Sequence, residues 1–323
     1  MTLLKMQHLN ITYKTQEKAI KAVRDFDLNI ELQDSMGIVG ESGSGKSTLA
    51  MAVLQLLPKD ITDISGEIIF NGIDLLKLNS EELKGIKWKE IAYVFQKSMN
   101  SLSPVHKIGY QLSDVYKVHE PNANKRQIRE RVCELFELVN LPSRVYDLYP
   151  HELSGGMMQR VSIALSLIYY PKVLILDEST TALDVVTQRQ ILEEIMKLQE
   201  KLNLTRIMIT HDVSIVASTC NKIAVMYAGY LLESGYVTDV LHSPKHPYTE
   251  ELLNSYPSLR GEKGYLKGIP GYLPDLSQEH KGCIFADRCR KAMEKCFYNR
   301  PEMVEFSNQW KVACHLAGSE YSE

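Results

Sequence analysis

The residues best suited to chemistry form one run, Gly40-Glu41-Ser42-Gly43-Ser44-Gly45-Lys46-Ser47-Thr48, which fits the pattern G-x-x-x-x-G-K-S/T. A strand-like apolar segment, 36–39, precedes it, and a helix-like segment, 47–54, follows. Backbone N–H groups, about half a positive charge at the helix start and the Lys46 ammonium therefore converge on one small space. Glycines let the backbone wrap phosphates without Cβ clashes. We expect a nucleoside triphosphate here; the alternative is a chance glycine-rich turn.

Asp177 and Glu178 form a second candidate element. They follow a continuous apolar run, 173–176, which is typical of a buried parallel strand. Phosphoryl transfer needs a divalent cation beside the phosphates and a group that orients the attacking water. Asp177 suits the first task and Glu178 the second, because a glutamate is ionised at neutral pH and can accept a proton. In isolation, two acids that cap a strand would be structural, but the phosphate loop favours the catalytic interpretation.

A third element, Leu153-Ser154-Gly155-Gly156-Met157-Met158-Gln159-Arg160, opens another helix with a serine and two glycines. Such a helix start is a second anion-binding terminus in the same chain. The economical explanation is that it contacts the phosphates of a facing subunit. The alternative is an ordinary N-cap of a buried helix.

The elements that must position these residues change in type along the chain. Strand-like segments surround the phosphate loop at 9–13, 26–32 and 66–72. From about residue 97 to 170 the pattern is helical, as in the amphipathic segment 125–139 and the apolar segment 157–169. Short apolar strands follow at 173–176, 207–210 and 223–226. We predict an α/β core with a helical insertion. Beyond about residue 240 proline and glycine become frequent, so a looser tail or small appended domain begins there.

Composition narrows the class of protein. The 323 residues suit about two domains, and 44% apolar with 24% charged residues is ordinary for a globular chain. A net charge of -3 gives no overall basic field, so no nucleic-acid partner is expected. The N-terminus lacks the pattern of a secretory signal, so we expect the protein to stay inside the cell. The longest apolar stretch, 161–170, is shorter than the roughly 20 residues of a spanning helix. Any membrane role should depend on a partner.

Together these elements resemble those of ATP-binding cassette (ABC) ATPases, whose signature motif is similar to Leu-Ser-Gly-Gly followed by Gln-Arg. The resemblance covers residues 1 to about 240. It implies a P-loop NTPase (RecA-like) α/β core with an antiparallel β subdomain, a helical subdomain at about 97–170 and a small irregular C-terminal domain. The ATP-binding residues that it implies are Tyr13, Gly40, Ser42, Gly43, Ser44, Gly45, Lys46, Ser47 and Thr48.

The same resemblance implies roles in hydrolysis. Lys46, Gln96, Glu178 and His211 would be catalytic, with His211 as the switch residue that contacts the γ-phosphate. Tyr13 would stack on the adenine. For Tyr13 the alternative is a tyrosine of the strand core, and for His211 taken alone it is a buried, hydrogen-bonded histidine.

Metal and partner contacts also follow from the resemblance. Mg²⁺ would bind Ser47, Gln96 and Asp177, and Gln96 would sense the transmembrane partner. The partner's ATP would be contacted by Ser154, Gly155, Gly156 and Asp184, the last within the segment 179–184 that is similar to the D-loop. Ser179 departs from the proline that close relatives commonly have.

A narrower resemblance rests on Ser243-Pro244-Lys245-His246-Pro247-Tyr248-Thr249-Glu250-Glu251-Leu252-Leu253, which is similar to the tail of dipeptide/oligopeptide importer ATPases. It extends over the whole chain and implies a cassette at 1–240 and an extension at 241–323. The implied partners are a second, homologous but non-identical ABC ATPase, two transmembrane permeases and an extracytoplasmic substrate-binding protein. The implied location is the cytoplasmic face of the membrane. Peptides are the expected cargo, and oligosaccharides or nickel chelates are the alternatives.

Two classes outside transport share the signature motif. DNA-repair or chromosome-organising ATPases separate their two nucleotide motifs by very long coiled coils, whereas only a short insertion exists here. Translation-associated ABC proteins normally fuse two cassettes, and this chain has one phosphate loop.

Four of the six cysteines gather in the tail. Cys283, Cys289, Cys296 and Cys314 are spaced C-x5-C-x6-C-x17-C, and the other two, Cys133 and Cys220, are expected to be buried in helical segments. A disulfide is disfavoured in a reducing compartment, so the four thiols could bind zinc or an iron-sulfur cluster, or stay free. The short C-x2-C spacing typical of structural zinc is absent. The tail resembles that of family members with a 4Fe-4S cluster, which would fasten a segment expected to bury little apolar surface.

Overall fold

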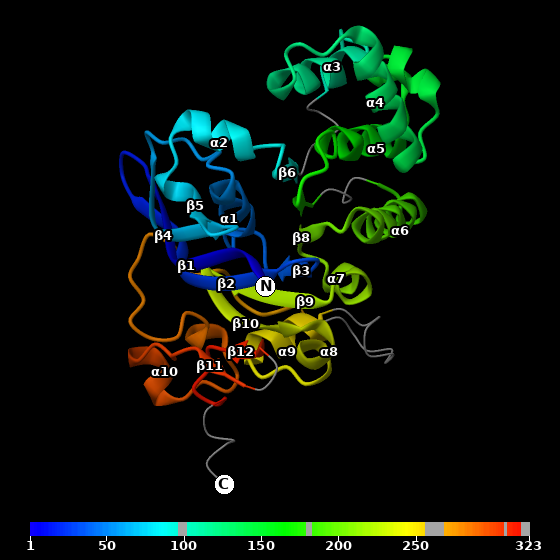
Figure 1. The fold of residues 1–323 in the computed structure, drawn as a ribbon. Helices are drawn as coiled ribbons and strands as arrows, with labels where there is room; N and C mark the ends of the chain where they lie inside the picture. The colour runs from blue at the N-terminus through cyan, green and yellow to red at the C-terminus, as the bar shows by residue number, and fades with distance from the viewer. Residues whose placement is uncertain (96–101, 179–182, 256–267, 307–308, 318–323) are drawn as a thin grey trace. The chain divides into compact units, whose positions relative to one another are not determined.

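The computed structural model describes residues 1–95, 102–178, 183–255, 268–306 and 309–317. The chain divides into two compact units, shown in Figure 1. Unit 1 comprises Met1–Lys77 and Met208–Glu323, and unit 2 comprises Leu78–Ile207.

An antiparallel sheet fills the N-terminal part of unit 1, with the order β2-β1-β4-β5. Its strands are β1 (Thr2–Lys14), β2 (Ala19–Glu31), β4 (Thr62–Phe70) and β5 (Ile73–Asp74). The apolar pattern of β1 changes phase between Met6 and Leu9, where the pairing with β2 shifts register and His8 has a φ of +46°. The bulge restores the buried face, because a shift of one residue would otherwise turn Leu9 and Ile11 towards solvent.

A second set of strands in unit 1 carries the phosphate loop. β3 (Ser35–Val39) pairs in parallel with β9 (Lys222–Tyr227), which pairs antiparallel with β10 (Tyr230–Tyr236). β10 in turn pairs with β12 (Lys311–Val312), and β12 pairs with β11 (Val304–Glu305). All five residues of β3 are buried, as expected for a strand covered on both faces. The helices of this part are α1 (Lys46–Val53), α7 (Val213–Thr219), α8 (Val237–His242), α9 (Pro247–Asn254) and α10 (Glu294–Tyr298), with short 3-10 turns η1 (Leu75–Lys77) and η6 (Ala286–Arg288).

Unit 2 combines a parallel strand pair with helices. β6 (Ile91–Val94) pairs with β7 (Val173–Asp177), and β8 (Thr205–Thr210) begins in this unit and ends in unit 1. The helices are α2 (Ser80–Ile86), α3 (Ile108–His119), α4 (Lys125–Leu138), α5 (Gly155–Ser166) and α6 (Val185–Leu202), with 3-10 turns η3 (Ser143–Asp147) and η4 (Pro150–Glu152). Figure 1 shows α3, α4 and α5 grouped together. Asn124 caps α4 through a reciprocal pair of bonds with Gln127, which fixes where that helix begins.

The predicted α/β class with a helical insertion is confirmed. The predicted segments overlap observed elements, but four of them run one or two residues past the observed ends, namely 26–32, 47–54, 66–72 and 125–139. The helix predicted at 157–169 instead begins at Gly155 and ends at Ser166. Cys133 and Cys220 are half-buried, so their prediction as buried residues was wrong. Cys133 lies on α4, whereas Cys220 follows the last helical residue of α7 and is extended. Within the described residues no helix is both long and apolar enough to span a membrane.

The tail buries more apolar surface than the sequence predicted. Tyr248 and Phe285 are fully buried in one core with Val39, Val225 and Tyr227 of the central strands. Their ring centroids lie 5.3 Å apart, and both lie within 5.2 Å of Tyr227. The expectation of a tail with little apolar burial was therefore wrong, because its aromatic residues are far apart in sequence and form one cluster only after folding.

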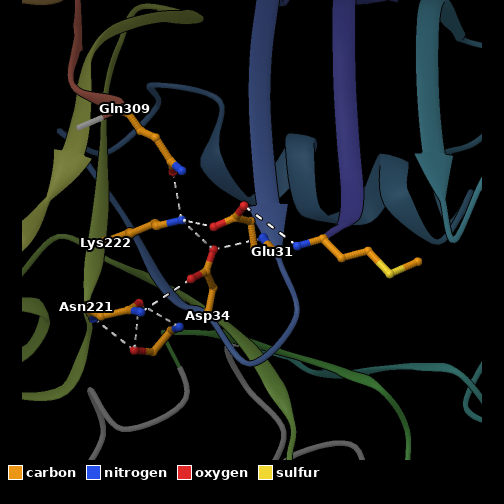
Figure 2. A network of polar contacts seen from close by, with 7 residues as sticks. Glu31, Asp34, Asn221, Lys222 and Gln309 are labelled. Atoms are coloured by element: carbon orange, nitrogen blue, oxygen red, sulfur yellow. Dashed lines mark hydrogen bonds and ion pairs between the residues drawn. The ribbon is translucent and has the colours of Figure 1, made fainter. Parts of the chain in front are cut away.

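A polar network also ties the tail to the strands (Figure 2). The Lys222 amino group, on a side chain only 6% exposed, donates to Glu31 at 2.9 Å, to Asp34 at 3.0 Å and to the tail residue Gln309 at 3.0 Å. Asn221 donates in turn to Asp34 at 3.3 Å. Burial alone would lower the pKa of Lys222, but the two carboxylates outweigh it and the pKa is raised, so Lys222 carries its charge in the folded protein.

Candidate functional site

The phosphate loop places Lys46 at its centre. Lys46 is 5% exposed, and its Nζ donates to the carbonyl oxygens of Gly40 and Glu41, both at 2.8 Å, and to Ser44 Oγ at 3.3 Å. These bonds hold a buried ammonium inside the loop. Ser42 and Gly43 are exposed, whereas Ser44 is fully buried. The loop therefore has an accessible rim around a fixed positive charge, which suits an anion.

Two glycines of the loop are required by its geometry. A Cβ on Gly40 would lie 2.0 Å from the Met226 carbonyl oxygen, and a Cβ on Gly45 would lie 2.1 Å from the Ala22 carbonyl oxygen. Gly45 has a φ of +98° at the N-cap of α1, a conformation that other residues rarely adopt. The strands on either side thus press against the loop, and the helix begins directly at Lys46.

Ser47 and Thr48 lie in the first turn of α1, and Tyr13 of β1 lies beside them. The Tyr13 hydroxyl is 3.2 Å from Thr48 Oγ1, and all three side chains are half-buried. Tyr13 is therefore a residue beside the phosphate loop. It is absent from the buried core of the sheet, so the alternative of a core tyrosine was wrong.

The two predicted acids lie at the end of β7 in unit 2. Asp177 is 3% exposed and its Oδ2 accepts a hydrogen bond of 2.6 Å from the Tyr93 hydroxyl. Burial, reinforced by the Asp177 charge, raises the pKa of Tyr93, which therefore remains a donor. Glu178 follows, half-buried, with a φ of +42°. This left-handed conformation costs a non-glycine residue about 1 kcal/mol, so the chain turns sharply where the buried strand ends.

His211 lies just after β8 and has an exposed side chain. The next residue, Asp212, caps α7: its Oδ1 accepts from the Ser214 backbone N–H at 2.8 Å, and its own N–H donates to Thr210 Oγ1 at 3.0 Å. The turn that carries His211 is thus fixed on both sides. Its exposure excludes the alternative of a buried structural histidine.

The signature element begins α5 in unit 2. Ser154 is the exposed N-cap, and its Oγ accepts from the Met157 N–H at 3.3 Å. A Cβ on Gly156 would lie 2.8 Å from Thr187 Cγ2 on α6, so glycine permits the close packing of the two helices. Asp184 is the exposed N-cap of α6, and the hydrogen bond from the Thr187 N–H lowers its pKa. The two N-cap residues are thus exposed, whereas Gly155 is half-buried and Gly156 is buried.

Gln96 and Ser179 lie outside the described residues, as do the other positions of 96–101 and 179–182. Lys46, Ser47 and His211 belong to unit 1, whereas Asp177, Glu178 and Ser154 belong to unit 2. Within unit 1, Tyr13 therefore lies beside the phosphate loop. Within unit 2, Asp177 and Glu178 lie together at the end of β7, and Tyr93 contacts Asp177.

The four tail cysteines line one small cavity together with His246 and Phe285. The residues between them turn tightly: the Cys283 N–H donates to the Cys296 carbonyl at 2.7 Å, and the Cys289 N–H to the Ala286 carbonyl at 3.1 Å. Burial raises the pKa of Cys283 to about 11 and also raises those of Cys289 and Cys314. As free groups, these thiols would be protonated at neutral pH, so a metal would have to withdraw their protons.

His246 is a site residue whose environment the sequence motif did not predict. It is 1% exposed, and burial lowers its pKa to about 3, so the ring is neutral. Nδ1 accepts from the Tyr248 N–H at 3.0 Å, which places the ring proton on Nε2. Nε2 is buried without a hydrogen-bond partner among the described residues, and the ring lines the cysteine cavity. The sequence shows only a histidine next to a proline, which does not indicate that the ring is buried or that it lines the cysteine cavity.

A larger cavity of 890 Å³ lies elsewhere in unit 1, between β1, β2, β10 and the tail. Several of its charged side chains are paired with one another. His8 Nδ1 is 2.9 Å from Asp25 Oδ1, and Arg300 Nη2 is 3.3 Å from Asp25 Oδ2. Of the predicted nucleotide-site residues that the structure describes, none lines it, so its size does not identify the reaction centre.

Comparison with known proteins gives the family. Residues 23–181 match the ABC transporter family, and residues 232–296 match the oligopeptide/dipeptide transporter C-terminal region. The oligopeptide transport ATP-binding protein OppD of Bacillus subtilis is 42% identical over 97% of this chain and 88% of its own length. The dipeptide transport ATP-binding protein DppD of Escherichia coli is 37% identical over 98% of this chain and 97% of its own length.

Solved structures give the fold. The ATP-binding cassette MJ0796, in a dimeric post-hydrolysis state with ADP and Pi, superposes with a TM-score of 0.63 at 28% identity, covering 72% of this chain and 98% of its own. The predicted P-loop NTPase core is therefore confirmed. Since the relatives match over almost the whole length, the chain belongs to the ATP-binding subunits of the dipeptide and oligopeptide ABC transporters and is an ATPase.

Proposed function

We propose that this ATPase powers the import of peptides and that it hydrolyses ATP at a site completed by a second ATPase subunit. The observation that carries the proposal is the phosphate loop, with the buried Lys46 ammonium held among the carbonyls of Gly40 and Glu41. Peptides are favoured as cargo because the similar proteins are named for oligopeptide and dipeptide transport. Oligosaccharides and nickel chelates remain the alternative cargoes, and a DNA-repair role has no support among these relatives.

The nucleotide would occupy the phosphate loop. Lys46 and the N–H groups at the start of α1 would bind the phosphates, and Tyr13 would stack on the adenine. Support for Tyr13 comes from its half-buried position and its contact with Thr48. The remaining contacts would come from the loop residues Gly40, Ser42, Gly43, Ser44, Gly45 and Ser47.

A magnesium ion would be held by oxygen ligands. The Ser47 hydroxyl, the Asp177 carboxylate and the Gln96 amide are the hard donors that Mg²⁺ prefers. The buried Asp177, held by the Tyr93 hydroxyl, fits this role, since a carboxylate fixed in place is a preorganised oxygen ligand. When bound, the ion would neutralise charge on the phosphates.

Glu178 would act as the general base and His211 would contact the γ-phosphate. Glu178 stands directly after the metal-binding acid, at the sharp turn that ends β7, and can accept a proton from attacking water. His211, exposed beside a capped helix start, can donate a hydrogen bond to a phosphate oxygen. Lys46 would stabilise the charge that develops during transfer.

The second subunit would supply the missing half of each site. Two helix starts with exposed N-cap residues carry Ser154, Gly155, Gly156 and Asp184, and N–H groups at such starts can meet an anion of a facing chain. The structurally similar cassette MJ0796 is dimeric. We propose a homologous, non-identical partner beneath two permeases at the cytoplasmic face of the membrane, fed by an extracytoplasmic binding protein. The proposed domains are a cassette at 1–240, with its helical subdomain at about 97–170, and an extension at 241–323.

The four tail cysteines would hold a 4Fe-4S cluster. The four thiols line one small cavity, and a 4Fe-4S cluster takes four thiolates, one on each iron. The short C-x2-C spacing typical of structural zinc is absent from this tail. Binding to iron would also favour the thiolate form of cysteines such as Cys283, whose pKa is raised by burial.

Reconstitution tests the proposed activity. The chain, its partner ATPase and the permeases in liposomes should release phosphate faster when the binding protein carries peptide than when it carries an oligosaccharide or a nickel chelate. Glu178→Gln should keep ATP affinity and lower turnover by about a hundredfold or more, whereas Lys46→Ala should weaken ATP binding itself. Wild-type turnover by Glu178→Gln would refute the assignment of the base.

Anaerobic purification tests the metal centre. Protein with a 4Fe-4S cluster should be brown, absorb broadly at about 400 nm and contain iron. Colourless protein with one zinc per chain would support the zinc alternative, and metal-free protein would support free thiols.

A further inference from the structure

Two residues of the tail converge on Glu41, the second residue of the phosphate loop. The Glu41 backbone N–H donates to the Tyr248 hydroxyl at 3.0 Å. The Glu41 carboxylate accepts from Arg288 Nη1 at 3.1 Å. Glu41 is thus held at its backbone and at its side chain by residues 207 and 247 positions further along the chain.

Glu41 in turn holds the lysine of the loop. Its carbonyl oxygen accepts from Lys46 Nζ at 2.8 Å. A small displacement of the Glu41 peptide would therefore move an acceptor of the ammonium that binds phosphate. Because Lys46 is buried, it has little freedom to compensate by changing its rotamer.

Arg288 is fixed on every side. Its side chain is 8% exposed, and besides Glu41 it donates to the Tyr227 hydroxyl at 3.0 Å, to the Pro270 carbonyl at 2.8 Å and to the Ile269 carbonyl at 3.2 Å. It is a planar group satisfied in several directions, so the guanidinium is a rigid link.

The other ends of both links lie at the cysteine cavity. Arg288 directly precedes Cys289. Tyr248 donates its N–H to His246, whose ring lines the cavity with the four cysteines. Phe285, between Cys283 and Cys289, packs against both Tyr227 and Tyr248. All three rings are fully buried. A close-packed cluster of this kind transmits displacement, because it contains no space to absorb it.

We propose that Arg288 and Tyr248 are positioning residues of the phosphate loop, through which occupancy of the cysteine site sets the affinity for ATP. With the site filled, Cys289 and His246 are held and Glu41 keeps Lys46 in its binding position. With the site empty, the links loosen and the loop binds nucleotide more weakly. The identity of the group that fills the cavity rests on the metal centre proposed above, whereas both links to Glu41 exist without it.

Titration of the purified full chain with a fluorescent ATP analogue tests the links. Arg288→Gln should raise Kd about five- to tenfold, since a hydrogen bond between charged groups is lost, and Arg288→Lys should recover part of this. Tyr248→Phe keeps the buried ring and should raise Kd about threefold, as expected for one neutral hydrogen bond. In the chain reconstituted with its partner ATPase and permeases, both substitutions should raise KM for ATP while leaving kcat nearly unchanged, which general destabilisation would not do. The matched control is Arg290→Gln, an arginine of the same turn that is 66% exposed and pairs with Glu251; it should bind as wild type.

Removal of the metal tests the coupling. Wild-type protein stripped by a chelator should bind ATP about as weakly as Arg288→Gln, and stripping Arg288→Gln should add nothing further. An unchanged Kd in Arg288→Gln and Tyr248→Phe would overturn the positioning role. If removal of the metal raises Kd by the same factor in wild type and in Arg288→Gln, the coupling is overturned. Iron analysis and absorbance at about 400 nm report on the metal centre independently of ATP binding. If the purified protein contains no iron but Arg288→Gln still raises Kd, the cluster is refuted and the links to Glu41 are not.

Discussion

Arg160 of α5 and Glu194 of α6 form a two-point ion pair, with Nε to Oε2 and Nη2 to Oε1 both at 2.9 Å. Their side chains are only 16% and 14% exposed, so solvent screens the pair weakly. The pair joins the helix that begins at the signature serine to the helix that begins at Asp184. Within unit 2 it therefore fixes the two helix starts that we propose face a partner.

Arg160→Lys should destabilise unit 2, because an ammonium cannot reproduce the paired geometry of a guanidinium. We expect a loss of about 1–2 kcal/mol in the free energy of unfolding, measured by denaturant titration. The control is Arg189→Lys on α6, whose pair with Glu193 is 82% and 54% exposed; it should change stability by less than about 0.5 kcal/mol. Equal losses in the two variants would contradict the importance of the buried pair.

Gly45→Ala should impair the phosphate loop through steric conflict. The new Cβ would lie 2.1 Å from the Ala22 carbonyl oxygen, at a φ of +98°. Gly72→Ala is a matched control, because its φ of +82° is similar but its Cβ would meet nothing within 4 Å among the described residues beyond its own chain neighbours. Thermal unfolding should show a cost of about 1 kcal/mol for Gly72→Ala from the backbone alone and a distinctly larger cost for Gly45→Ala, with ATP binding lost only in the latter. Similar behaviour of both would show that the strands do not confine the loop.

Lys222→Met should strongly destabilise unit 1, since it leaves the buried Asp34 carboxylate without its cation. Breaking such a pair by removal of one partner costs about 3 kcal/mol. Lys18→Met, whose pair with Asp275 at 3.8 Å is 59% and 45% exposed, should cost less than about 1 kcal/mol. Adding Asp34→Asn to Lys222→Met should restore part of the stability in a double-mutant cycle. No recovery would show that Lys222 acts through packing alone.

The stability that Glu31 contributes should depend on pH. Its hydrogen bond and charge interaction with Lys222 lower its pKa below the ordinary 4.5. A carboxylate with a lowered pKa contributes stability that is complete above the unfolded value and is lost as the pH falls through the folded value. The difference in melting temperature between wild type and Glu31→Gln should thus be constant near neutral pH and shrink below about pH 4.5. A difference that persists unchanged in acid would show that the charge of Glu31 is irrelevant.

Local patterns predicted the elements because each depends on neighbours in sequence. The run 36–48 combines a strand, glycines and a helix start, so the phosphate loop and its N-terminal anion site follow from adjacent residues alone. The apolar runs at 173–176 and 223–226 likewise fall within β7 and β9. The helix predicted at 157–169 begins two residues earlier because Ser154 caps it, a contact between residues three positions apart.

The same local patterns could not predict side-chain surroundings. His211 in isolation is expected to be buried, yet it is exposed, and the tail that is rich in proline and glycine carries Tyr248 and Phe285 into the core. The burial of a side chain depends on which distant segments pack against it. The composition of its own segment does not contain that information.

The amino-acid sequence by itself determined the chemistry: a loop for phosphate, two acids after a strand, a capped helix start and four clustered cysteines. Only the tertiary structure decided that Arg288 and Tyr248 meet at Glu41 and that His246 faces the cysteines. The physical reason is the distance along the chain over which each kind of interaction acts. Backbone hydrogen bonding and side-chain periodicity act over a few residues, whereas a contact across more than 200 positions exists only once the strands and tail have packed into one core.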